Sequence, residues 1–223
     1  RLYNDGVQEI KYYSYAELDN FFKYMRVNRE RRIKQRIERK KIKGRKIRFQ
    51  YRFLVHELVP YKNQFILLGE AFYPRYRHID GGFAGSGRTA MVFDGYQYTH
   101  AVILCIDAKG GLLWDNSFEI NDVKTFTLEQ FVKMDAKKDE IALLYLYENK
   151  IRTKIIQDST VLEGKTSSPI QLKADSSLPS ERESTFNKLD YWYKDYFLAY
   201  GVRNIVSPAP LGRGKRKVFF VSK

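Results

Sequence analysis

The chain is poor in cysteine, proline and histidine, with one, six and three of these residues among 223, and it has no long apolar run. A single cysteine excludes an internal disulfide, but this does not indicate a compartment, because many periplasmic proteins also lack disulfides. Without about 18 consecutive apolar residues, no segment predicts a membrane-spanning helix. The chain starts at Arg1 without Met, as a processed protein or a fragment would, so the lack of a visible signal peptide does not indicate a location.

Hydrophobic residues make up 43% of the chain and aromatic residues 15%, which is enough for a packed core and excludes global disorder. The formal charge of +14 is concentrated in one segment. Between Arg26 and Arg48 there are thirteen Lys or Arg and two Glu, a net of +11, which leaves +3 for the other 200 residues. The sequence therefore describes a nearly neutral protein with one basic arm.

The segment from Thr99 to Ile120 carries the clearest fold signal. Its apolar run ends at Asp107, and Ala108-Lys109-Gly110-Gly111 supplies turn residues before Leu112-Leu113-Trp114 continues as an apolar strand. This pattern predicts a β-hairpin in the middle of the chain.

The basic arm is predicted to belong to a long helix over residues 14–43. Ser14 and Glu17 have capping-box spacing, and Leu18, Phe21, Phe22 and Met25 form an apolar face. Only isolated isoleucines interrupt the charged second half, which is therefore expected to project from the protein. Gly44 is the expected stop.

The rest of the chain predicts a single, mainly β domain over residues 1–223. Short apolar segments separated by turn residues predict two four-stranded antiparallel meanders, near 49–118 and 124–162, which resemble β-propeller blades. The first includes a strand that ends at Pro74. Residues 165–182 are expected to be a loop or linker, followed by a Tyr-rich helix around 189–200 and a closing strand at 217–221.

Motifs that could carry catalysis are weak. The stretch from Gly82 to Thr89 has P-loop spacing, but Arg88 replaces the lysine and the next residues are too β-prone to open a helix, so a surface loop is favoured. No spacing among the histidines (His56, His78 and His100) or the strand carboxylates (Glu57, Glu70, Asp94, Asp115 and Glu119) selects a metal site or an acid–base pair. Cys105 is expected to be a buried strand residue. No metal and no cofactor is predicted.

Three segments, VHELVPYKNQFILLGEAFYPRYR, VFDGYQYTHAVILCIDAKGGLLWDNSFEIND and LDYWYKDYFLAYGVRNI, resemble uncharacterised envelope proteins of the Bacteroidota. This resemblance implies an exported protein with a propeller-like β fold and no known activity. It further implies a periplasmic or outer-membrane-associated location, as an accessory subunit of an outer-membrane assembly such as the type IX secretion translocon. It carries over no catalytic residue.

The expected function is therefore non-enzymatic: a scaffold or accessory subunit that binds a protein partner, such as a membrane-protein assembly, and no small-molecule substrate is indicated. The candidate partner-binding residues are the basic side chains of the arm: Arg29, Arg31, Arg32, Lys34, Arg36, Arg39, Lys40 and Lys41. A nucleic-acid-binding module that uses these residues on phosphates is one alternative, although the arm lacks base-stacking aromatics. A hydrolase that uses carboxylates and His56 is another, and finding His56 alone in a packed core would exclude that version.

Overall fold

The computed structural model describes residues 10–45, 47, 49–80, 89–137, 139–148, 150–170, 181–194, 196–205 and 215–222. These residues are mainly β, and every strand pairing between them is antiparallel, as predicted. The chain divides into two compact units, 1–130 and 131–223, where the sequence predicts a single domain. No helix in the described ranges is long and apolar enough to cross a membrane.

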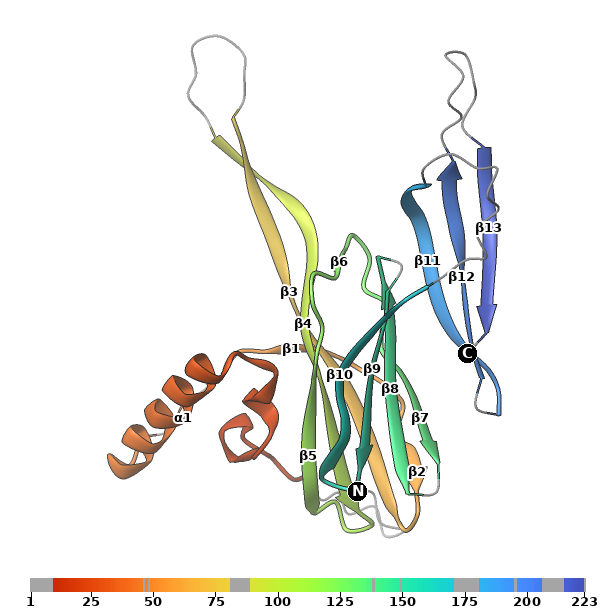
Figure 1. Cartoon of the computed structure of the whole chain (residues 1–223). Coiled ribbons are helices and arrows are strands. Elements are labelled where there is room, and N and C mark those ends of the chain that lie inside the picture. The colour runs from red at the N-terminus through yellow and green to blue at the C-terminus, as the bar shows by residue number, and fades with distance from the viewer. Residues whose placement is uncertain are drawn as a thin grey trace. The chain divides into compact units, whose positions relative to one another are not determined.

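The first unit is built on one antiparallel sheet (Figure 1). Its elements are the 3₁₀ turns η1 (Tyr15–Glu17) and η2 (Phe21–Tyr24), helix α1 (Val27–Ile42), and strands β1 (Arg52–Val55), β2 (Val59–Tyr61), β3 (Gln64–Asp80), β4 (Thr89–Asp107), β5 (Leu112–Glu119) and β6 (Lys124–Thr125). The sheet order is β1-β3-β4-β5, with β2 paired to β3 and β6 paired to β4.

The predicted central hairpin is confirmed as β4 and β5. The Asp107 carboxylate accepts the backbone N–H groups of Lys109 at 2.8 Å and Gly111 at 2.7 Å, which lowers the pKa of this carboxyl group. Gly110 adopts φ +75°, a conformation that glycine takes without steric cost. Asp107 and Gly110 therefore form the tight turn that the sequence predicts.

Strand β3 is longer than predicted, because it continues through Pro74 to Asp80. Pro74 pairs with Tyr96 of β4, while the pairing of β1 with β3 has already ended at Phe72. A proline is tolerated in a strand where its missing N–H would point away from a neighbour. The prediction that the strand ends at Pro74 is wrong because Pro74 lies where β3 has become an edge strand.

The predicted helix over residues 14–43 is also wrong, because only Val27–Ile42 is α-helical. The Ser14–Glu17 capping box forms, but it caps the 3₁₀ turn η1, and Leu18 is extended with ψ 129°. The backbone N–H groups of Asp19 and Asn20 donate to the Asp115 carboxylate, each at 2.9 Å. In a continuous helix these two groups would bond to carbonyls four residues earlier, so this tertiary contact replaces the helical bonds.

An aromatic layer covers the face of the sheet that carries His100 and Val102. The layer comprises Tyr15, Phe21, Phe22, Tyr24, Phe49, Tyr51 and Phe53, whose rings contact one another or His100. Phe21 and Phe22 are fully buried, and Leu18 and Met25 pack in the same cluster. The predicted apolar face at 18–25 therefore docks on the protein, although not as an α-helix.

The second unit contains two open sheets. The strands are β7 (Lys133–Lys137), β8 (Glu140–Tyr147), β9 (Lys150–Gln157), β10 (Thr160–Pro169), β11 (Glu181–Tyr193), β12 (Tyr196–Ile205) and β13 (Lys215–Ser222). The orders β10-β9-β8-β7 and β11-β12-β13 are both simple meanders. The first is a four-stranded meander as expected, but it begins at Lys133 and not near residue 124, because Lys124–Thr125 pairs with β4 as β6. The predicted closing strand is present as β13, which pairs with β12. None of the described sheets closes, so the propeller prediction is not confirmed.

The predicted Tyr-rich helix is wrong, because these residues form the β11–β12 hairpin. Leu189 pairs with Ala199, and Tyr193 pairs with Tyr196 across the turn. Lys194 adopts φ +48° at that turn, where a glycine or asparagine would have been a recognisable turn signal. Strands also occupy both ends of the predicted 165–182 loop, while residues 171–180 lie outside the described part of the chain.

Candidate partner-binding surface

Helix α1 forms because its sixteen residues, VNRERRIKQRIERKKI, are mostly strong helix formers without glycine or proline. Its end is a Schellman motif. Gly44, with φ +61°, donates its N–H to the Lys41 carbonyl, and Arg45 donates to the Lys40 carbonyl, both at 2.9 Å. The prediction that Gly44 ends the helix is confirmed.

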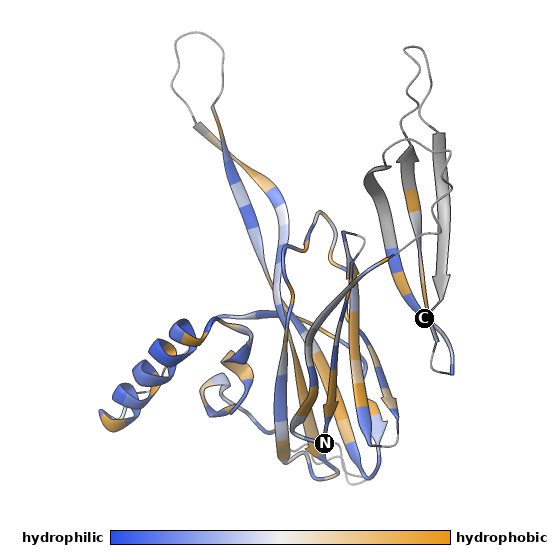
Figure 2. Ribbon diagram, viewed as in Figure 1, coloured by the Kyte–Doolittle hydropathy of each residue, from blue (hydrophilic) through white to orange (hydrophobic). Residues whose placement is uncertain are grey.

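The apolar contacts of α1 with the rest of its unit lie on one narrow side. Ile33 and Ile37 pack against the buried cluster that contains Phe21, Phe22 and Val102. No residue of α1 is itself fully buried. Apart from Val27 and Ile42 at its ends, the rest of the helix is polar, and blue predominates along it in Figure 2. A helix with so thin an apolar side is held by few contacts and presents most of its surface to a partner.

One exposed side of α1 carries positive charge alone, and we call it the basic stripe. It consists of Arg29, Arg32, Arg36 and Lys40 of the helix, together with Lys43, the residue that caps its C-terminal end. Their spacing of three, four, four and three residues places them on one face of a helix of 3.6 residues per turn, over about 21 Å. None of the five forms an ion pair with another described residue. Their charges are therefore available to an external partner.

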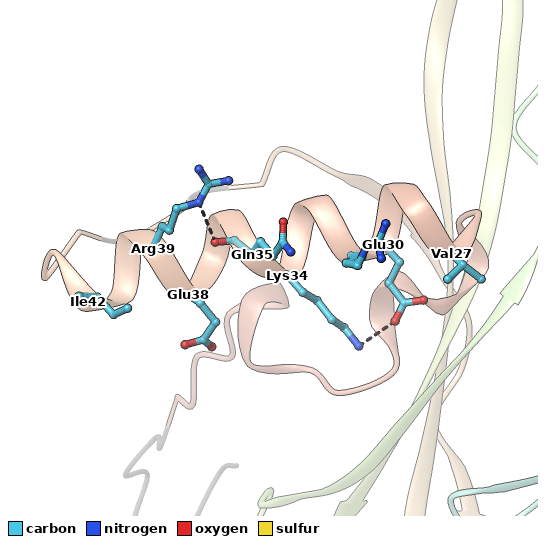
Figure 3. Close-up of a pocket in the computed structure, with 8 residues that line it drawn as sticks. Val27, Glu30, Lys34, Gln35, Glu38, Arg39 and Ile42 are labelled. Carbon is cyan, nitrogen blue, oxygen red and sulfur yellow. Dashed lines mark hydrogen bonds and ion pairs between the residues drawn. The ribbon is translucent and has the colours of Figure 1, made fainter.

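A second exposed side of α1 is a shallow groove of about 650 Å³ (Figure 3). Val27 and Ile42 lie at its two ends, with 77% and 82% of their surfaces exposed. Between them Lys34 pairs with Glu30 at 2.7 Å, and Glu38 adds a second carboxylate. This groove has mixed charge and apolar ends, so it differs in chemistry from the basic stripe.

The structure distributes the eight predicted binding residues over different sides of α1. Arg29, Arg32, Arg36 and Lys40 belong to the basic stripe, whereas Arg31, Lys34 and Arg39 line the groove. Lys41 lines another hollow, of about 750 Å³, between the C-terminal half of α1 and residues 12–19. A ligand that uses the stripe therefore contacts only half of the predicted set.

The segment that precedes α1 is attached to the sheet by hydrogen bonds at Asp19 and Asn20. Asp115 is buried and accepts the two N–H groups at Asp19 and Asn20, and burial raises the pKa of its carboxyl group. The Asn20 side chain donates to the Asp115 carbonyl at 2.8 Å, and the Ser117 hydroxyl donates to the Asn20 carbonyl at 2.8 Å. These bonds fix the chain at Asn20, before helix α1 begins at Val27.

Aromatic rings that surround His100, here called the aromatic box, also attach the segment before α1 to the sheet. The imidazole is fully buried and stacks on the Tyr24 ring, with centroids 3.7 Å apart. Phe21 and Tyr51 contact it edge-on at 5.2 and 5.5 Å. Its Nδ1 hydrogen-bonds Thr99 Oγ1 at 2.9 Å, and its Nε2 has no partner among the described atoms. Burial lowers the pKa of His100 to about 3.

The other histidines do not gather with His100. His56 Nε2 lies 2.6 Å from Oε1 of the buried Glu70, so His56 is not alone in an apolar core, and the stated test does not exclude the hydrolase alternative. His78 is exposed on β3. Within the described ranges, no three His, Cys, Asp or Glu side chains form a group that could hold a metal ion.

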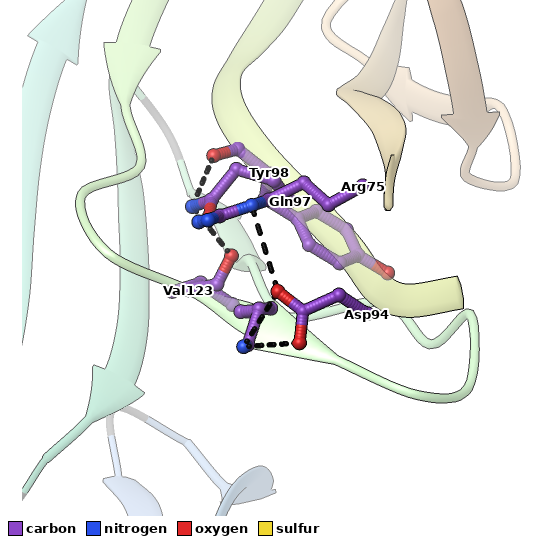
Figure 4. A network of polar contacts seen from close by, with 6 residues as sticks. Arg75, Asp94, Gln97, Tyr98 and Val123 are labelled. Carbon is purple, nitrogen blue, oxygen red and sulfur yellow. Dashed lines mark hydrogen bonds and ion pairs between the residues drawn. The ribbon is translucent and has the colours of Figure 1, made fainter. Parts of the chain in front are cut away.

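The remaining strand carboxylates lie apart. Asp94 pairs with Lys124 at 3.2 Å and approaches Arg75 at 3.9 Å (Figure 4), while Glu57 is exposed. Glu119 faces His100 in the strand register. The strands therefore separate these groups, and the described geometry favours no pair for acid–base chemistry.

Two further sequence motifs can be placed. Residues 82–88 of the P-loop-like stretch lie outside the described part of the chain, but Thr89 begins strand β4. A phosphate-binding P-loop opens onto a helix, so the strand agrees with the interpretation against nucleotide binding. Cys105 is buried in β4, as predicted, and its thiol donates to Gln64 Oε1 at 2.8 Å.

Comparison with known proteins adds no family: no family model, curated protein or solved structure matches this chain. The basic stripe was visible in the sequence as a spacing of three and four residues, but net charge alone does not reveal it. Asp115 and His100 gave no local signal for their role in holding the α1 segment, because their partners lie 76 to 96 residues away.

Proposed function

We propose that this protein is a non-enzymatic scaffold or accessory subunit that binds an acidic protein surface through the basic stripe of α1. The observation that carries the proposal is the stripe itself: five like charges on one face, none of which forms an ion pair with another described residue. Like charges along a helix destabilise it, and a partner's carboxylates would remove this cost. The planar guanidinium groups of Arg29, Arg32 and Arg36 suit bidentate pairing with carboxylates.

A protein partner fits α1 better than a nucleic acid does. The helix contains no aromatic side chain on which a base could stack. Glu30 and Glu38 lie on the groove side and would repel phosphates there, whereas Val27 and Ile42 offer apolar contacts that a protein can bury. The proposal extends to a subunit of a cell-envelope complex at the outer membrane, and this part rests on the sequence resemblance alone.

The proposal is tested by removing equal charge from two sides of α1. In the tagged protein, Arg29→Gln, Arg32→Gln and Arg36→Gln together alter the stripe, and Arg31→Gln, Lys34→Gln and Lys41→Gln together form the matched control. Capture of the partner from an envelope extract is expected to fall about tenfold for the stripe variant, since three ion pairs of about 0.5 kcal/mol each are lost. The control variant is expected to retain most of the capture.

Glutamine has nearly the helix propensity of arginine and lysine, so circular dichroism should show the same helix content in both variants. Equal loss of capture in the two variants would contradict a role for the stripe. Nuclease-sensitive capture of nucleic acid would support the phosphate-binding alternative instead, with binding that weakens steeply with salt.

A further inference from the structure

Beyond the sheet, β3 and β4 continue as a two-stranded ribbon, defined here as residues 75–80 of β3 and 89–95 of β4. β1 pairs with β3 only up to Phe72, and β6 pairs with β4 only at Tyr96 and Gln97. Within the described ranges the ribbon strands therefore pair only with each other, and Figure 1 shows them extending together past the neighbouring strands. An isolated pair of strands is marginal in water, and three or more strands are needed for stability.

The root of the ribbon is fixed by the contacts shown in Figure 4. Arg75 donates to Gln97 Oε1 at 3.2 Å, and Gln97 donates to the Val123 carbonyl at 3.0 Å. Gly95, with φ +102°, lies so close to β6 that a Cβ atom would come within 2.7 Å of the Thr125 carbonyl oxygen. The register shift after Arg75 leaves Asp94 without a backbone partner on β3. This extra residue is a β-bulge, which increases the local twist. The ribbon is thus held in one direction from its base.

The two edges of the ribbon differ in chemistry. The β3 edge carries Arg75, Arg77 and His78, with Pro74 at its root, and proline and charge are the devices by which natural sheets block further strand pairing. The β4 edge from Ala90 to Phe93 has neither. Met91 and Val92 on this edge are 62% and 39% exposed. The β3 edge is therefore protected. The β4 edge is open to another strand at Met91 and Val92, while the Phe93 ring at its base contacts Phe126.

We propose that the β4 edge pairs with the same edge of a second copy of this chain, as antiparallel strands around a two-fold axis at Met91, so that Met91 faces its own symmetry mate. In such pairing each residue faces its own symmetry mate or a close neighbour, so an edge that pairs with itself must avoid like charges. Ala90–Phe93 meets this condition, whereas two β3 edges would bring arginines together. The product is a four-stranded ribbon with both protected β3 edges outside, which stops growth at the dimer.

The test is the mass of the purified chain at increasing concentration, measured by sedimentation equilibrium. The native protein is expected to rise from 26.4 kDa toward twice that mass. Met91→Lys should remain at the monomer mass over the same range, because it places two lysines near the axis. Ile79→Lys adds the same charge to the exposed β3 strand and should associate like the native protein.

Both lysines lie outside the core, so thermal melts should show both variants folded like the native chain. As a second readout, Met91→Cys should form a covalent dimer under oxidising conditions, and Ile79→Cys should not. A native chain that stays monomeric at every concentration would overturn the proposal, as would equal loss of association in Met91→Lys and Ile79→Lys. Species larger than a dimer would overturn the closed two-fold arrangement.

Discussion

The free energy of unfolding is expected to fall by about 1.4 kcal/mol for each pH unit below 6.5, and His100→Phe is expected to remove most of this slope. Burial lowers the pKa of His100 from 6.5 to about 3 in the folded protein. Between these values the unfolded chain binds a proton that the folded chain does not. The stability from this group is therefore complete above pH 6.5 and is lost as pH falls toward about 3.

The aromatic box explains why the folded protein resists this proton. Tyr24, Phe21 and Tyr51 surround the imidazole without a carboxylate in hydrogen-bonding contact with it, and Nε2 has no acceptor among the described atoms. Stacking on Tyr24 would stabilise an imidazolium by about 0.5–2 kcal/mol, which is less than the several kcal/mol that its burial costs. Desolvation therefore decides the direction of the shift.

The measurement is urea unfolding between about pH 6.5 and pH 5, where the native protein should lose about 2 kcal/mol relative to His100→Phe. The phenyl ring retains the stacking on Tyr24 and cannot titrate. His100→Leu gives a second non-titrating variant if phenylalanine overfills the site, and the exposed His78→Gln is the control that should keep the native slope. A slope in His100→Phe equal to the native slope would contradict the assignment. Because the box holds the α1 segment, acid should also weaken partner capture.

Local signals in the sequence predict local structure correctly in this protein. Gly44 ends α1 and Gly110 forms the β4–β5 turn because each position needs a left-handed backbone conformation. Alternating and continuous apolar runs likewise predict mainly antiparallel β structure and the β7–β10 meander. Such features depend on residues close together in the chain, so one sequence is enough to find them.

The failures arise where a distant residue or an unmarked turn decides the conformation. Asp115 takes the N–H groups of Asp19 and Asn20, 95 and 96 residues away, and no local pattern reports this. In the β11–β12 hairpin the turn at Lys194 lacks glycine, and aromatic residues around it match helical spacing by coincidence. Residue type and spacing thus predicted a basic helix, but they did not predict the contacts that attach it to the sheet.

Because Asp115 attaches the segment before α1 to the sheet, Asp115→Ala is expected to lower the free energy of unfolding by about 3 kcal/mol. The substitution removes the buried acceptor of the backbone N–H groups of the exposed Asp19 and the half-buried Asn20, at about 1–3 kcal/mol for each group that water does not satisfy instead. Asp115→Asn has one acceptor oxygen, so it can satisfy one group and should lose less. Urea unfolding measures both variants, with the exposed Glu57→Ala as the control that should change stability by less than about 0.5 kcal/mol.

The same substitution separates stability from attachment of the basic helix. Asp115 holds the 18–24 segment, whereas the contacts of Ile33 and Ile37 hold α1 directly. Hydrogen exchange in Asp115→Ala should therefore increase most at residues 15–26, because the 3₁₀ turns lose their acceptor while the β3–β4 ladder remains paired. A loss below about 1 kcal/mol, or protection that falls evenly over the whole sheet, would show that the carboxylate is not the anchor of this segment. The two readouts together decide whether the α1 segment is fixed by this polar contact or by apolar packing alone.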